Sequence, residues 1–532
     1  MMRRTPFLVA AMLLMATTLV AADLERAAMK SMERPLGKFD RAAHFAAMTS
    51  LQERLSSTAI GLADTAPLLV EVTPEDRRAV REGRRMEQKL RVGVVKELSV
   101  PLRFERERIT PHRSVLHDAF GAVRGGDFGA FDWAGVVRTP EAAAVRIHLT
   151  DFDLPEGAEM FVYTRDGMAF GPYTGRGPNG TGDFWTNTVA GAEVVVRLRA
   201  GSIGEPRFTI SGVGHLTPDF AMANHLRPVT NAANTKPCSF NADCTVDAAC
   251  GGVNAAVATA SDAVAHILFA SGRYLYICSG GLVADSDLTT NVPYFVTANH
   301  CIRRSSEASS LETFFFYRAS QCQSCPDPGA ANTTGSSIVS TNRSSDYTLL
   351  RLSQNAPSGA AFLGWTSIAI ANTNGVNLYR LSHPLGAPQA YSEHVVDTSK
   401  PTCQSWPRGG WIYSRDIYGA TEGGSSGSPV VNGAGQLVGQ LSGGCGYNVN
   451  DVCDTESNAT VDGAFAAYFP SVEQFLGGGG GPVCVDADGD GHCVTDGDCN
   501  DNDASVYPGA NDTKGKAGRN GIDNDCDGII DG

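Results

Sequence analysis

The sequence has little cysteine in its first half, little positive charge and few long apolar runs. No cysteine occurs before Cys238, although the chain holds 14 in all, so the first part of the chain must fold without disulfides. The formal net charge is −14, and a nucleic-acid-binding surface is therefore not expected. After the N-terminus, no stretch of ~20 apolar residues predicts a membrane span in the mature protein. Aromatic residues make up only 8% of the chain, whereas 59 glycines favour β structure with many turns.

The N-terminus has the three parts of a secretory signal. Two arginines lie within residues 1–4, an apolar run covers residues 7–20, and small residues precede Asp23. The run is short for the alternative, a membrane anchor. We therefore expect residues 1–22 to be a cleaved signal peptide and the protein to be secreted, either free outside the cell or associated with its surface. Cysteines of an exported chain would form disulfides in the oxidising compartment.

Residues 23–236 are expected to form an N-terminal propeptide. Apolar residues recur at helical spacing over 23–62, and the Arg-rich residues 76–96 read as a solvated surface segment or helix. Short β-like runs separated by Gly, Pro and Asn turns predict a β-sandwich over 99–215. The polar and irregular residues 216–236 then form a linker.

The second half of the chain divides into three segments. Short strands alternate with turns over 237–476, which is typical of a double β-barrel or a large sandwich. Glycine occupies every position from 477 to 481, a flexible linker, and residues 482–532 form a separate Asp-rich tail. The predicted fold class is mostly β.

Three short strings in the 237–476 segment carry residues suited to nucleophilic catalysis. They are Phe295-Val296-Thr297-Ala298-Asn299-His300-Cys301, Ser344-Ser345-Asp346-Tyr347-Thr348-Leu349-Leu350 and Gly423-Gly424-Ser425-Ser426-Gly427-Ser428-Pro429. A serine hydroxyl needs a base within hydrogen-bond reach, and that base needs a partner that fixes its tautomer. We assign these three roles to Ser426, His300 and Asp346. The backbone amides of Gly424 and Ser426 would form an oxyanion hole.

Each string taken alone has an ordinary structural explanation. A histidine before a cysteine is usually structural, an aspartate that opens a strand is usually a turn cap, and a Gly/Ser-rich string is usually a loop. The order His, Asp, Ser, at intervals of 46 and 80 residues and downstream of a secretory signal, favours catalysis. Lipase or esterase activity is disfavoured because no Gly-x-Ser-x-Gly elbow occurs among alternating strands and helices.

These strings resemble the segments around the catalytic residues of chymotrypsin-like serine peptidases. From Cys238 to about Phe475 the chain is most similar to bacterial lysyl endopeptidases, in strings that include Cys278-Ser279-Gly280-Gly281-Leu282, Ser382-His383-Pro384-x-Gly386 and Gly439-Gln440-Leu441-Ser442-Gly443-Gly444. The resemblance implies a chymotrypsin-like double β-barrel with the triad between the barrels, no cofactor for catalysis, and protein or peptide substrates. It also implies that Ser442 supports Asp346, that Ser442, Gly443 and Gly444 line the specificity pocket, and that His383 is structural.

The residue that sets specificity is left open by the sequence. Ala420, at the expected base of the pocket, carries no charge. Counting from Cys453 puts the pocket aspartate of lysyl endopeptidases at Asp462, whereas counting back from the Gly463 region puts it at Thr460. A preference for Lys or Arg at P1, the residue before the cleaved bond, is therefore an expectation that the two counts do not decide.

One position departs from many animal relatives. These carry an aspartate immediately before the catalytic serine, which pairs with the new N-terminus on activation, whereas this chain has Ser425. We therefore expect latency to come from the N-terminal propeptide, which would fold, inhibit or chaperone the enzyme and then be removed.

The even number of cysteines in each block, ten in 238–453 and four in 484–526, predicts disulfides closed within blocks. Cys278 would tie the strand before the histidine to Cys301. The resemblance implies two further pairs, Cys238 with Cys453 and Cys244 with Cys322. The connectivity of Cys250, Cys325, Cys403 and Cys445 stays open. A zinc site at Cys322-x-x-Cys325 is disfavoured because no second pair has suitable spacing.

The tail has the composition of a calcium-binding segment. It is too poor in apolar residues to fold on a core alone, and alternating Asp and Gly supply the oxygen ligands that Ca²⁺ requires. The expected ligands are Asp486, Asp488, Asp490, Asp496, Asp498, Asp501, Asp503, Asp523, Asp525 and Asp527. The tail resembles thrombospondin type 3-like calcium repeats and bacterial metal-binding repeats, and it departs from EF-hands because no Glu closes the loop. The alternative is a disordered acidic tail.

The sequence therefore predicts a secreted serine endopeptidase, made as a zymogen and acting through an acyl-enzyme. Its calcium-binding tail would either attach it to a cell-surface or matrix ligand or be a proteolytically removable appendage, and the sequence leaves these two roles open. The rival from another class is a catalytically silent peptidase fold that serves in calcium-dependent adhesion or surface binding.

Overall fold

The computed structural model describes two long stretches of the chain. They are residues 37–218 and 242–477, with gaps at 59, 61, 63–64, 84–88, 105–108, 111–112, 115–119, 127–128, 166, 202–203, 288–289 and 404, together with 505–507 and 510. The signal peptide, Cys238, most of the glycine linker and all ten expected calcium ligands lie outside the described residues. By contact density the chain divides into two units, Met1–Phe469 and Pro470–Gly532, and the description below concerns the first.

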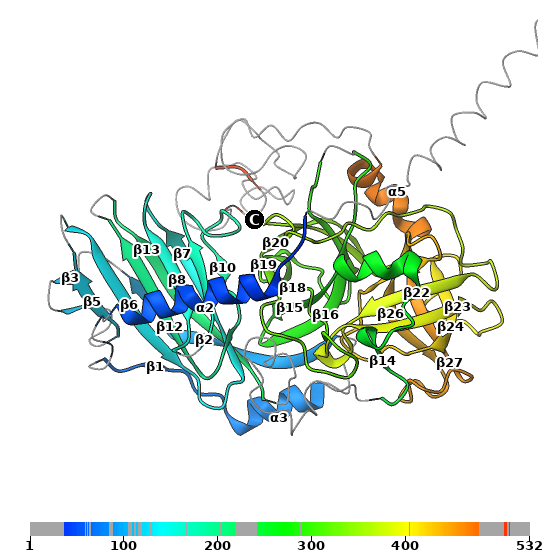
Figure 1. Cartoon of the computed structure of the whole chain (residues 1–532), viewed down its shortest axis with the longest axis horizontal. Helices are drawn as coiled ribbons and strands as arrows, with labels where there is room; N and C mark the ends of the chain where they lie inside the picture. The colour runs from blue at the N-terminus through cyan, green and yellow to red at the C-terminus, as the bar shows by residue number, and fades with distance from the viewer. Residues whose placement is uncertain are drawn as a thin grey trace, which may run out of the picture. The chain divides into compact units, whose positions relative to one another are not determined.

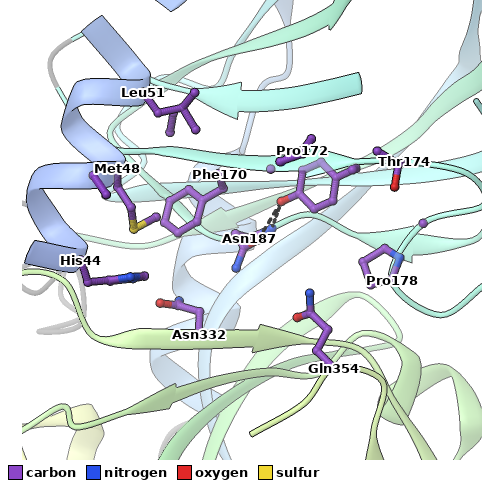
Figure 2. Close-up of a pocket in the computed structure, with 15 residues that line it drawn as sticks. His44, Met48, Leu51, Phe170, Pro172, Thr174, Pro178, Asn187, Asn332 and Gln354 are labelled. Carbon is purple, nitrogen blue, oxygen red and sulfur yellow. Dashed lines mark hydrogen bonds between the residues drawn. The ribbon is translucent and has the colours of Figure 1, made fainter. Parts of the chain in front are cut away.

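The first helices begin where the sequence supplies caps and apolar spacing. Helix α2 (Arg41–Ser57) begins after Asp40, whose carboxylate accepts a hydrogen bond from the Ala43 amide at 2.9 Å. In Figure 1 it lies across the strands of the N-terminal sheets. A cavity of about 600 Å³ lies beside it, and Figure 2 draws the residues that line this cavity. Helix α3 (Pro74–Gly83) follows. No helix among the described residues combines the length and hydropathy that a membrane span requires.

Residues 90–96 correct one expectation. They were expected in the solvated Arg-rich segment, but they open strand β2 (Leu90–Phe104), because Leu90, Val92 and Val94 alternate and are buried. Apolar residues that recur with a period of two favour a strand, and this pattern determined the local structure in spite of the charged residues that precede it.

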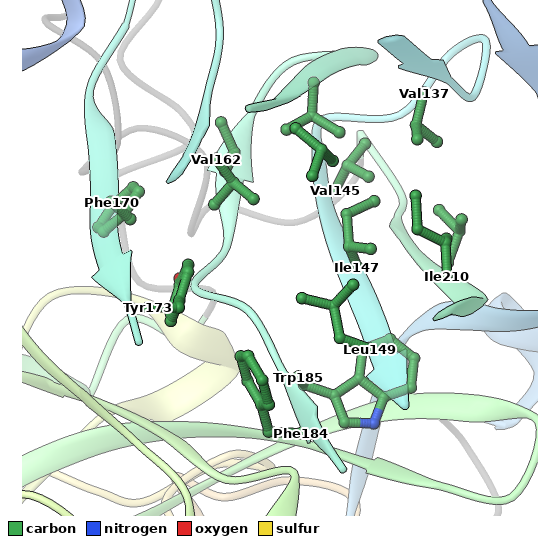
Figure 3. Close-up of a cluster of buried hydrophobic side chains, with 14 of the residues drawn as sticks. Val137, Val145, Ile147, Leu149, Val162, Phe170, Tyr173, Phe184, Trp185 and Ile210 are labelled. Atoms are coloured by element: carbon green, nitrogen blue, oxygen red, sulfur yellow. The ribbon is translucent and has the colours of Figure 1, made fainter. Parts of the chain in front are cut away.

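Residues 68–216 form a β-sandwich, which we call the N-terminal sandwich. One sheet contains β1 (Leu68–Leu69), β5 (Ala122–Gly125), β6 (Phe131–Arg138), β12 (Glu193–Ala200), β8 (Glu159–Tyr163) and β9 (Ala169–Tyr173). The other begins with β10 (Phe184–Trp185), β11 (Val189–Ala190), β7 (Ala144–Asp153), β13 (Arg207–Leu216) and β2. Figure 3 shows part of the apolar core, with side chains from both sheets. Strands β3 (Ile109–Thr110) and β4 (Arg113–Ser114) form a separate two-stranded sheet.

The second sheet continues from β2 into a nearly closed first barrel. That barrel contains β16 (Tyr274–Leu282), β15 (Val264–Ser271), β18 (Glu312–Phe315), β19 (Ala331–Thr334), β17 (Tyr294–Ala298), β21 (Tyr347–Leu352) and β20 (Ser336–Asn342). The short helix α4 (Ser305–Ser309) follows the turn after β17. Strand β2 therefore pairs with the sandwich on one side and with the barrel on the other.

A second barrel is closed. Its strands are β14 (Val246–Asp247), β23 (Ala390–Val396), β22 (Asn377–Ser382), β25 (Pro429–Asn432), β26 (Leu437–Gly446), β27 (Asn458–Ala464) and β24 (Trp411–Tyr418), and β24 pairs with both β27 and β23. Helix α5 (Phe465–Leu476) follows β27. The expected mostly-β fold, a double β-barrel preceded by a β-sandwich, is confirmed. The limits of propeptide and peptidase segments stay predictions.

Candidate active site

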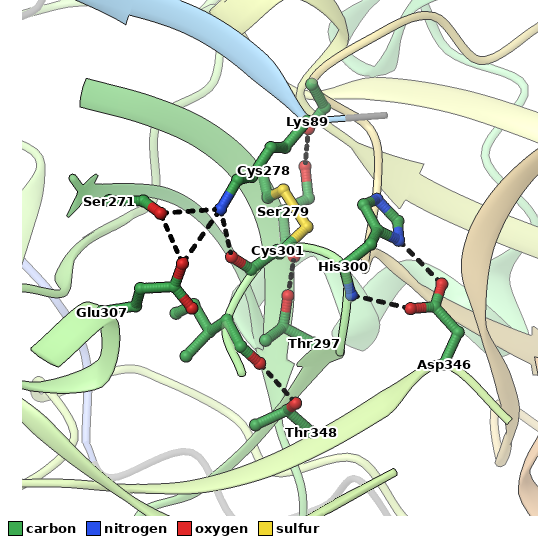
Figure 4. Close-up of a disulfide and its surroundings, with 12 residues drawn as sticks. Lys89, Ser271, Cys278, Ser279, Thr297, His300, Cys301, Glu307, Asp346 and Thr348 are labelled. Atoms are coloured by element: carbon green, nitrogen blue, oxygen red, sulfur yellow. Dashed lines mark hydrogen bonds and ion pairs between the residues drawn. A yellow bond between two sulfur atoms is a disulfide. The ribbon is translucent and has the colours of Figure 1, made fainter. Parts of the chain in front are cut away.

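Strand pairing brings His300 to Asp346. Strands β17 and β21 are antiparallel neighbours, with Ala298 opposite Tyr347, so the residues just after β17 meet the residue just before β21. The two carboxylate oxygens of Asp346 contact His300 twice, the backbone amide at 2.7 Å and ring Nδ1 at 2.7 Å (Figure 4). Because the carboxylate holds the proton on Nδ1, ring Nε2 is left as a base. Nε2 is buried and makes no hydrogen bond with a described residue.

Three contacts hold the turn that carries His300. A disulfide joins Cys301 to Cys278 on β16, Thr348 Oγ1 donates to the Ile302 carbonyl at 2.6 Å, and the Asn299 amide donates to the Asp346 carbonyl at 3.0 Å. Figure 4 shows the disulfide next to His300. The imidazole is therefore fixed from both sides of the turn, as a general base requires.

The turn with Ser426 packs against the same strands. The Ser279 amide on β16 donates to the Ser426 carbonyl at 2.8 Å. Gly427 has φ +79°, and a Cβ there would collide with Thr297 Oγ1 and the Ser279 carbonyl. Since Thr297 lies on β17, three residues before His300, the Ser426 turn of the second barrel is seated beside the His300 turn of the first.

Carbonyl contacts fix the two peptide units that would form an oxyanion hole. The Gly423 carbonyl accepts from the Leu385 amide at 2.6 Å, and the Ser425 carbonyl accepts from the Ser428 amide at 3.0 Å. In a trans peptide the N–H points opposite to the C=O. The amides of Gly424 and Ser426 are thereby aimed away from those partners and held without reorganisation, as charge stabilisation requires.

His383 lies behind this turn and is fully buried. Its ring stacks on Tyr317 with 5.5 Å between centroids, and its backbone carbonyl would lie 2.9 Å from a Cβ on Gly424. Burial lowers the pKa of His383 to about 4, so the ring is neutral at ordinary pH. The histidine packs against the turn from behind, as the structural role expected for it requires.

A pocket of about 360 Å³ opens beside Ser426. Its lining includes Ser442, Gly443, Gly444 and Thr460, and the role of residues 442–444 in substrate specificity stays a prediction. Two expectations about its neighbours are corrected. Ala420 is buried and not among the lining residues, and Ser442 Oγ makes no hydrogen bond with a described residue, so it does not support Asp346 by a hydrogen bond.

The expected role of Asp462 is also corrected. Asp462 lies on β27, is fully buried and accepts a hydrogen bond from Arg380 Nη2 at 2.7 Å, within a buried ion pair. It is not among the residues that line the pocket. Side chains of a strand alternate between its faces, so Thr460 and Asp462 point the same way, but Asp462 is two residues farther along and is covered by Arg380.

Asp416 on β24 lines the pocket and was not predicted from the sequence. Its Oδ1 accepts hydrogen bonds from His394 Nδ1 at 2.7 Å and from Thr460 Oγ1 at 2.6 Å, whereas its Oδ2 makes no hydrogen bond with a described residue. Burial by itself raises the pKa of Asp416, but the His394 contact, the Thr460 hydrogen bond and the charge of Arg380 hold it below its usual value. The pocket therefore contains a carboxylate that is ionised at neutral pH.

The sequence offered only a weak signal for Asp416. A charged residue stands within the strand-like run Trp411–Tyr418, where it reads equally well as a solvent-facing residue. Its partner His394 precedes it by 22 residues and is carried by the adjacent strand β23, which pairs His394 with Asp416. Only that pairing shows that the carboxylate points inward.

The disulfides differ from two of the three expected pairs. Cys278 is bonded to Cys301 as expected. Cys244 is bonded to Cys453 and Cys250 to Cys322, so the expected pairs Cys238–Cys453 and Cys244–Cys322 are wrong. Cys403 is bonded to Cys445, and Cys325 is also disulfide-bonded. A zinc site is therefore not available at Cys322 and Cys325. The sulfurs of Cys278 and Cys301, which lie near His300, are bonded to each other and are therefore also unavailable as metal ligands.

Comparison with known proteins agrees with this geometry. Residues 240–461 match the family model "Lysyl endopeptidase, C-terminal domain", and residues 498–532 match "Putative metal-binding motif". A lysyl endopeptidase of Pseudomonas aeruginosa is 27% identical over 330 residues, which cover 57% of this chain and 66% of that protein, just under two thirds of its length. Secreted RxLR effector protein 73 of Plasmopara viticola is 24% identical over 366 residues, covering 63% of this chain and 88% of that protein.

Among solved structures, an HtrA-type protease with tripeptide aligns over 42% of this chain and 63% of its own, at 15% identity and a TM-score of 0.31. The active form of the Rv3671c protease from M. tuberculosis aligns over 46% and 95%, at 15% identity and a TM-score of 0.29. Residues 240–461 thus combine two β-barrels and the His300–Asp346 pair with a match to the lysyl endopeptidase C-terminal domain, and this homology supports a peptidase.

Proposed function

We propose that the protein is an active serine endopeptidase with His300, Asp346 and Ser426 as its catalytic triad. The observation that carries the proposal is the double contact of Asp346 with His300, at 2.7 Å to the backbone amide and 2.7 Å to Nδ1, next to the buried Ser426 turn. Isolated structural histidines do not need both contacts, whereas a general base needs its tautomer and its position fixed together.

The residues would act in sequence on one peptide bond. Nε2 of His300 takes the proton of Ser426 Oγ as the oxygen attacks the scissile carbonyl, and Asp346 stabilises the imidazolium that forms. The amides of Gly424 and Ser426 hold the oxyanion. His300 then donates its proton to the leaving amine, and water repeats the attack on the acyl-enzyme with His300 again as base.

We further propose that the enzyme prefers Lys or Arg at P1. Asp416 Oδ2 has no hydrogen-bond partner among the described residues, and the pocket that contains it also contains Ser426. A cationic side chain that enters from the Ser426 end would pair with this oxygen, whereas an acidic side chain would meet a like charge. Thr460, one of the two positions that the sequence left open, contributes by orienting Asp416.

The cellular setting is proposed from the sequence. The chain would be secreted as a zymogen, and residues 23–236 would be its pro-region. Residues 482–532 would bind Ca²⁺ through the Asp residues named above and attach the enzyme to a cell-surface or matrix ligand. Isothermal titration of the full chain with Ca²⁺ tests the tail, and it should give no heat after the ten aspartates are changed to Asn.

Active-site labelling tests the central proposal. A peptidyl phosphonate with Lys at P1 should label the wild type, and labelling should be lost in Ser426→Ala and kept in the matched controls Ser425→Ala and Ser428→Ala. If processed wild-type protein with native circular dichroism takes no label from phosphonates of any P1 type, the proposal is wrong and the catalytically silent adhesion protein is favoured.

A further inference from the structure

The boundary between the N-terminal sandwich and the peptidase domain is a shared sheet. Strand β2 pairs with β13 of the sandwich and with β16 of the first barrel, where Val94 is opposite Tyr274 and Leu90 is opposite Ile277. In Figure 1 β2 runs from the sandwich into the barrel. Without β2, residues 274–277 of β16 would present unpaired backbone groups at a sheet edge, a feature that folded proteins normally cover.

The two parts also share an apolar core. Six buried residues of the first barrel belong to the same cluster as the sandwich core: Leu268, Leu275, Ile277, Phe314, Tyr317 and Ala330. All six are at most 3% exposed. Removal of the sandwich would uncover this apolar surface of the barrel next to the unpaired strand edge.

A buried carboxylate of the first barrel depends on the sandwich. Glu312 on β18 is fully buried, and it accepts hydrogen bonds from Asn187 Nδ2 at 3.0 Å and from the amide and hydroxyl of Thr188 at 3.0 and 2.5 Å. Glu312 lies 3.5 Å from Nε of the fully buried Arg146. The side-chain amide of Asn187, which is labelled in Figure 2, is oriented by Tyr173, whose hydroxyl donates to Asn187 Oδ1 at 2.8 Å.

From the described part of the peptidase domain, one side chain bonds Glu312, that of Asn332 at 3.1 Å. In return, Arg146 Nη1 donates to the Ser310 carbonyl at 2.9 Å. A buried charge whose partner is removed is strongly destabilising. The sandwich therefore supplies most of the groups that make Glu312 tolerable inside the protein.

A second ion pair reaches the catalytic turn. Lys89, just before β2, places Nζ 3.1 Å from Glu307 Oε1 and 3.4 Å from the Cys301 carbonyl (Figure 4). Nζ also lies over the Tyr276 ring, 4.5 Å from its centroid. The other oxygen of Glu307 accepts hydrogen bonds from the Arg303 amide at 2.8 Å and from the Arg304 amide at 3.1 Å. Lys89 thus supports the turn that begins at His300.

We propose that the N-terminal sandwich, although it lies within the expected pro-region, is not released on maturation. It stays bound to the peptidase as a permanent subunit after the connecting segment is cut, and it positions the His300 turn through Lys89. A pro-segment that leaves after maturation needs a surface that both parts can expose to water. The surface between the sandwich and the peptidase domain instead contains a paired strand and a shared apolar core. It also contains two carboxylates of the peptidase domain, Glu307 and Glu312, that are neutralised by Lys89 and Arg146 of the sandwich. The positioning role of Lys89 rests on the proposed function, whereas the permanence of the complex does not.

Cleavage of the connecting segment tests permanence. A recognition site for an exogenous protease is placed in residues 219–241 of the full chain carrying Ser426→Ala, and the cut protein is run on size-exclusion chromatography in 0.15 M and 1 M NaCl at about 1 μM. We expect the two fragments to co-elute in both salts and to separate only in denaturant. Separation in native buffer, with a peptidase fragment that keeps its circular dichroism, would overturn the proposal.

Substitution of Lys89 tests the positioning role. Lys89→Met should lower kcat at least fivefold with KM changed less than twofold, and Lys89→Arg should recover most of the loss. The matched control is Lys96→Met, which removes an ion pair to Asp76 within the N-terminal region. Equal kcat values for the two Met variants would exclude the Lys89 role. Wild type that takes no label from the phosphonate refutes the proposed function instead, and the co-elution experiment still decides permanence.

Discussion

Replacing Asp416 by Asn should remove the preference for cationic side chains at P1. The substitution keeps the shape of the side chain and can keep the contacts with His394 and Thr460, but it deletes the charge of the buried carboxylate that lines the pocket. Since Asp416 is only 9% exposed, the charge is little screened by solvent or salt. The effect should therefore be confined to substrates with Lys or Arg at P1.

The magnitude follows from the position of the free oxygen. Two unit charges ~4 Å apart interact by about 4 kcal/mol at an effective dielectric constant of ~20. Desolvation of the substrate cation offsets part of this, and loss of one partner of a buried charge pair typically costs about 2–5 kcal/mol. We expect a loss of about 2–4 kcal/mol, and kcat/KM for Lys and Arg substrates should fall on the order of 30- to 1000-fold.

The assay compares kcat/KM for a series of peptides that differ only at P1, with Lys, Arg, Leu and Glu. Asp416→Asn should lower the values for Lys and Arg, leave the value for Leu within about threefold and raise the value for Glu. Two controls separate specificity from general damage. Asp454→Asn changes a half-buried carboxylate that also lines the pocket, and it should leave the Lys to Leu ratio unchanged.

Asp462→Asn is the opposite control. It weakens the buried pair with Arg380, so it should lower the free energy of unfolding by about 3–5 kcal/mol without changing the Lys to Leu ratio. The reasoning about the pocket is refuted if Asp416→Asn keeps the wild-type ratio, and more so if Asp462→Asn shifts it.

Three further outcomes are expected. Changing Cys278 and Cys301 together to Ser removes a disulfide that spans 23 residues. Urea titration should show that the free energy of unfolding falls by about 3 kcal/mol, and activity should also fall. Gly427 has φ +79°, and in Gly427→Ala the new methyl group would collide with Thr297 and displace the Ser426 turn. The kcat of this variant should fall by about 10²-fold, measured on protein with native circular dichroism. Burial depresses the pKa of His383 from 6.5 to about 4, so the free energy of unfolding should fall as the pH is lowered from 6.5 toward about 4. In urea titrations across this range, His383→Gln should lose less of its free energy of unfolding than wild type does. Equal losses would contradict the assignment.

The sequence indicated the candidate catalytic residues because local strings carry the requirements of each role. His300 follows an apolar strand, Asp346 precedes one, and Ser426 stands among glycines that permit a tight turn, so each local structure is readable within a few residues. The mostly-β fold followed in the same way from short alternating runs and turn residues.

The disulfides could not be read from the sequence. Cys244 pairs with Cys453 across 209 residues, and no local pattern distinguishes this partner from Cys322, which the resemblance suggested. Pairings at such separation depend on the placement of the barrels, and counting cysteines along the chain gives only the set from which the pairs are drawn.

What the sequence determined by itself is therefore the kind of fold and the three residues that could perform the chemistry. What the tertiary structure decided is which residues share a space. It moved the pocket charge from Asp462 to Asp416, because Arg380 neutralises the former and strand β23 brings His394 to the latter. It also joined β2 of the N-terminal sandwich to the peptidase barrel, because backbone hydrogen bonds pair any two strands of matching edge whatever their distance along the chain.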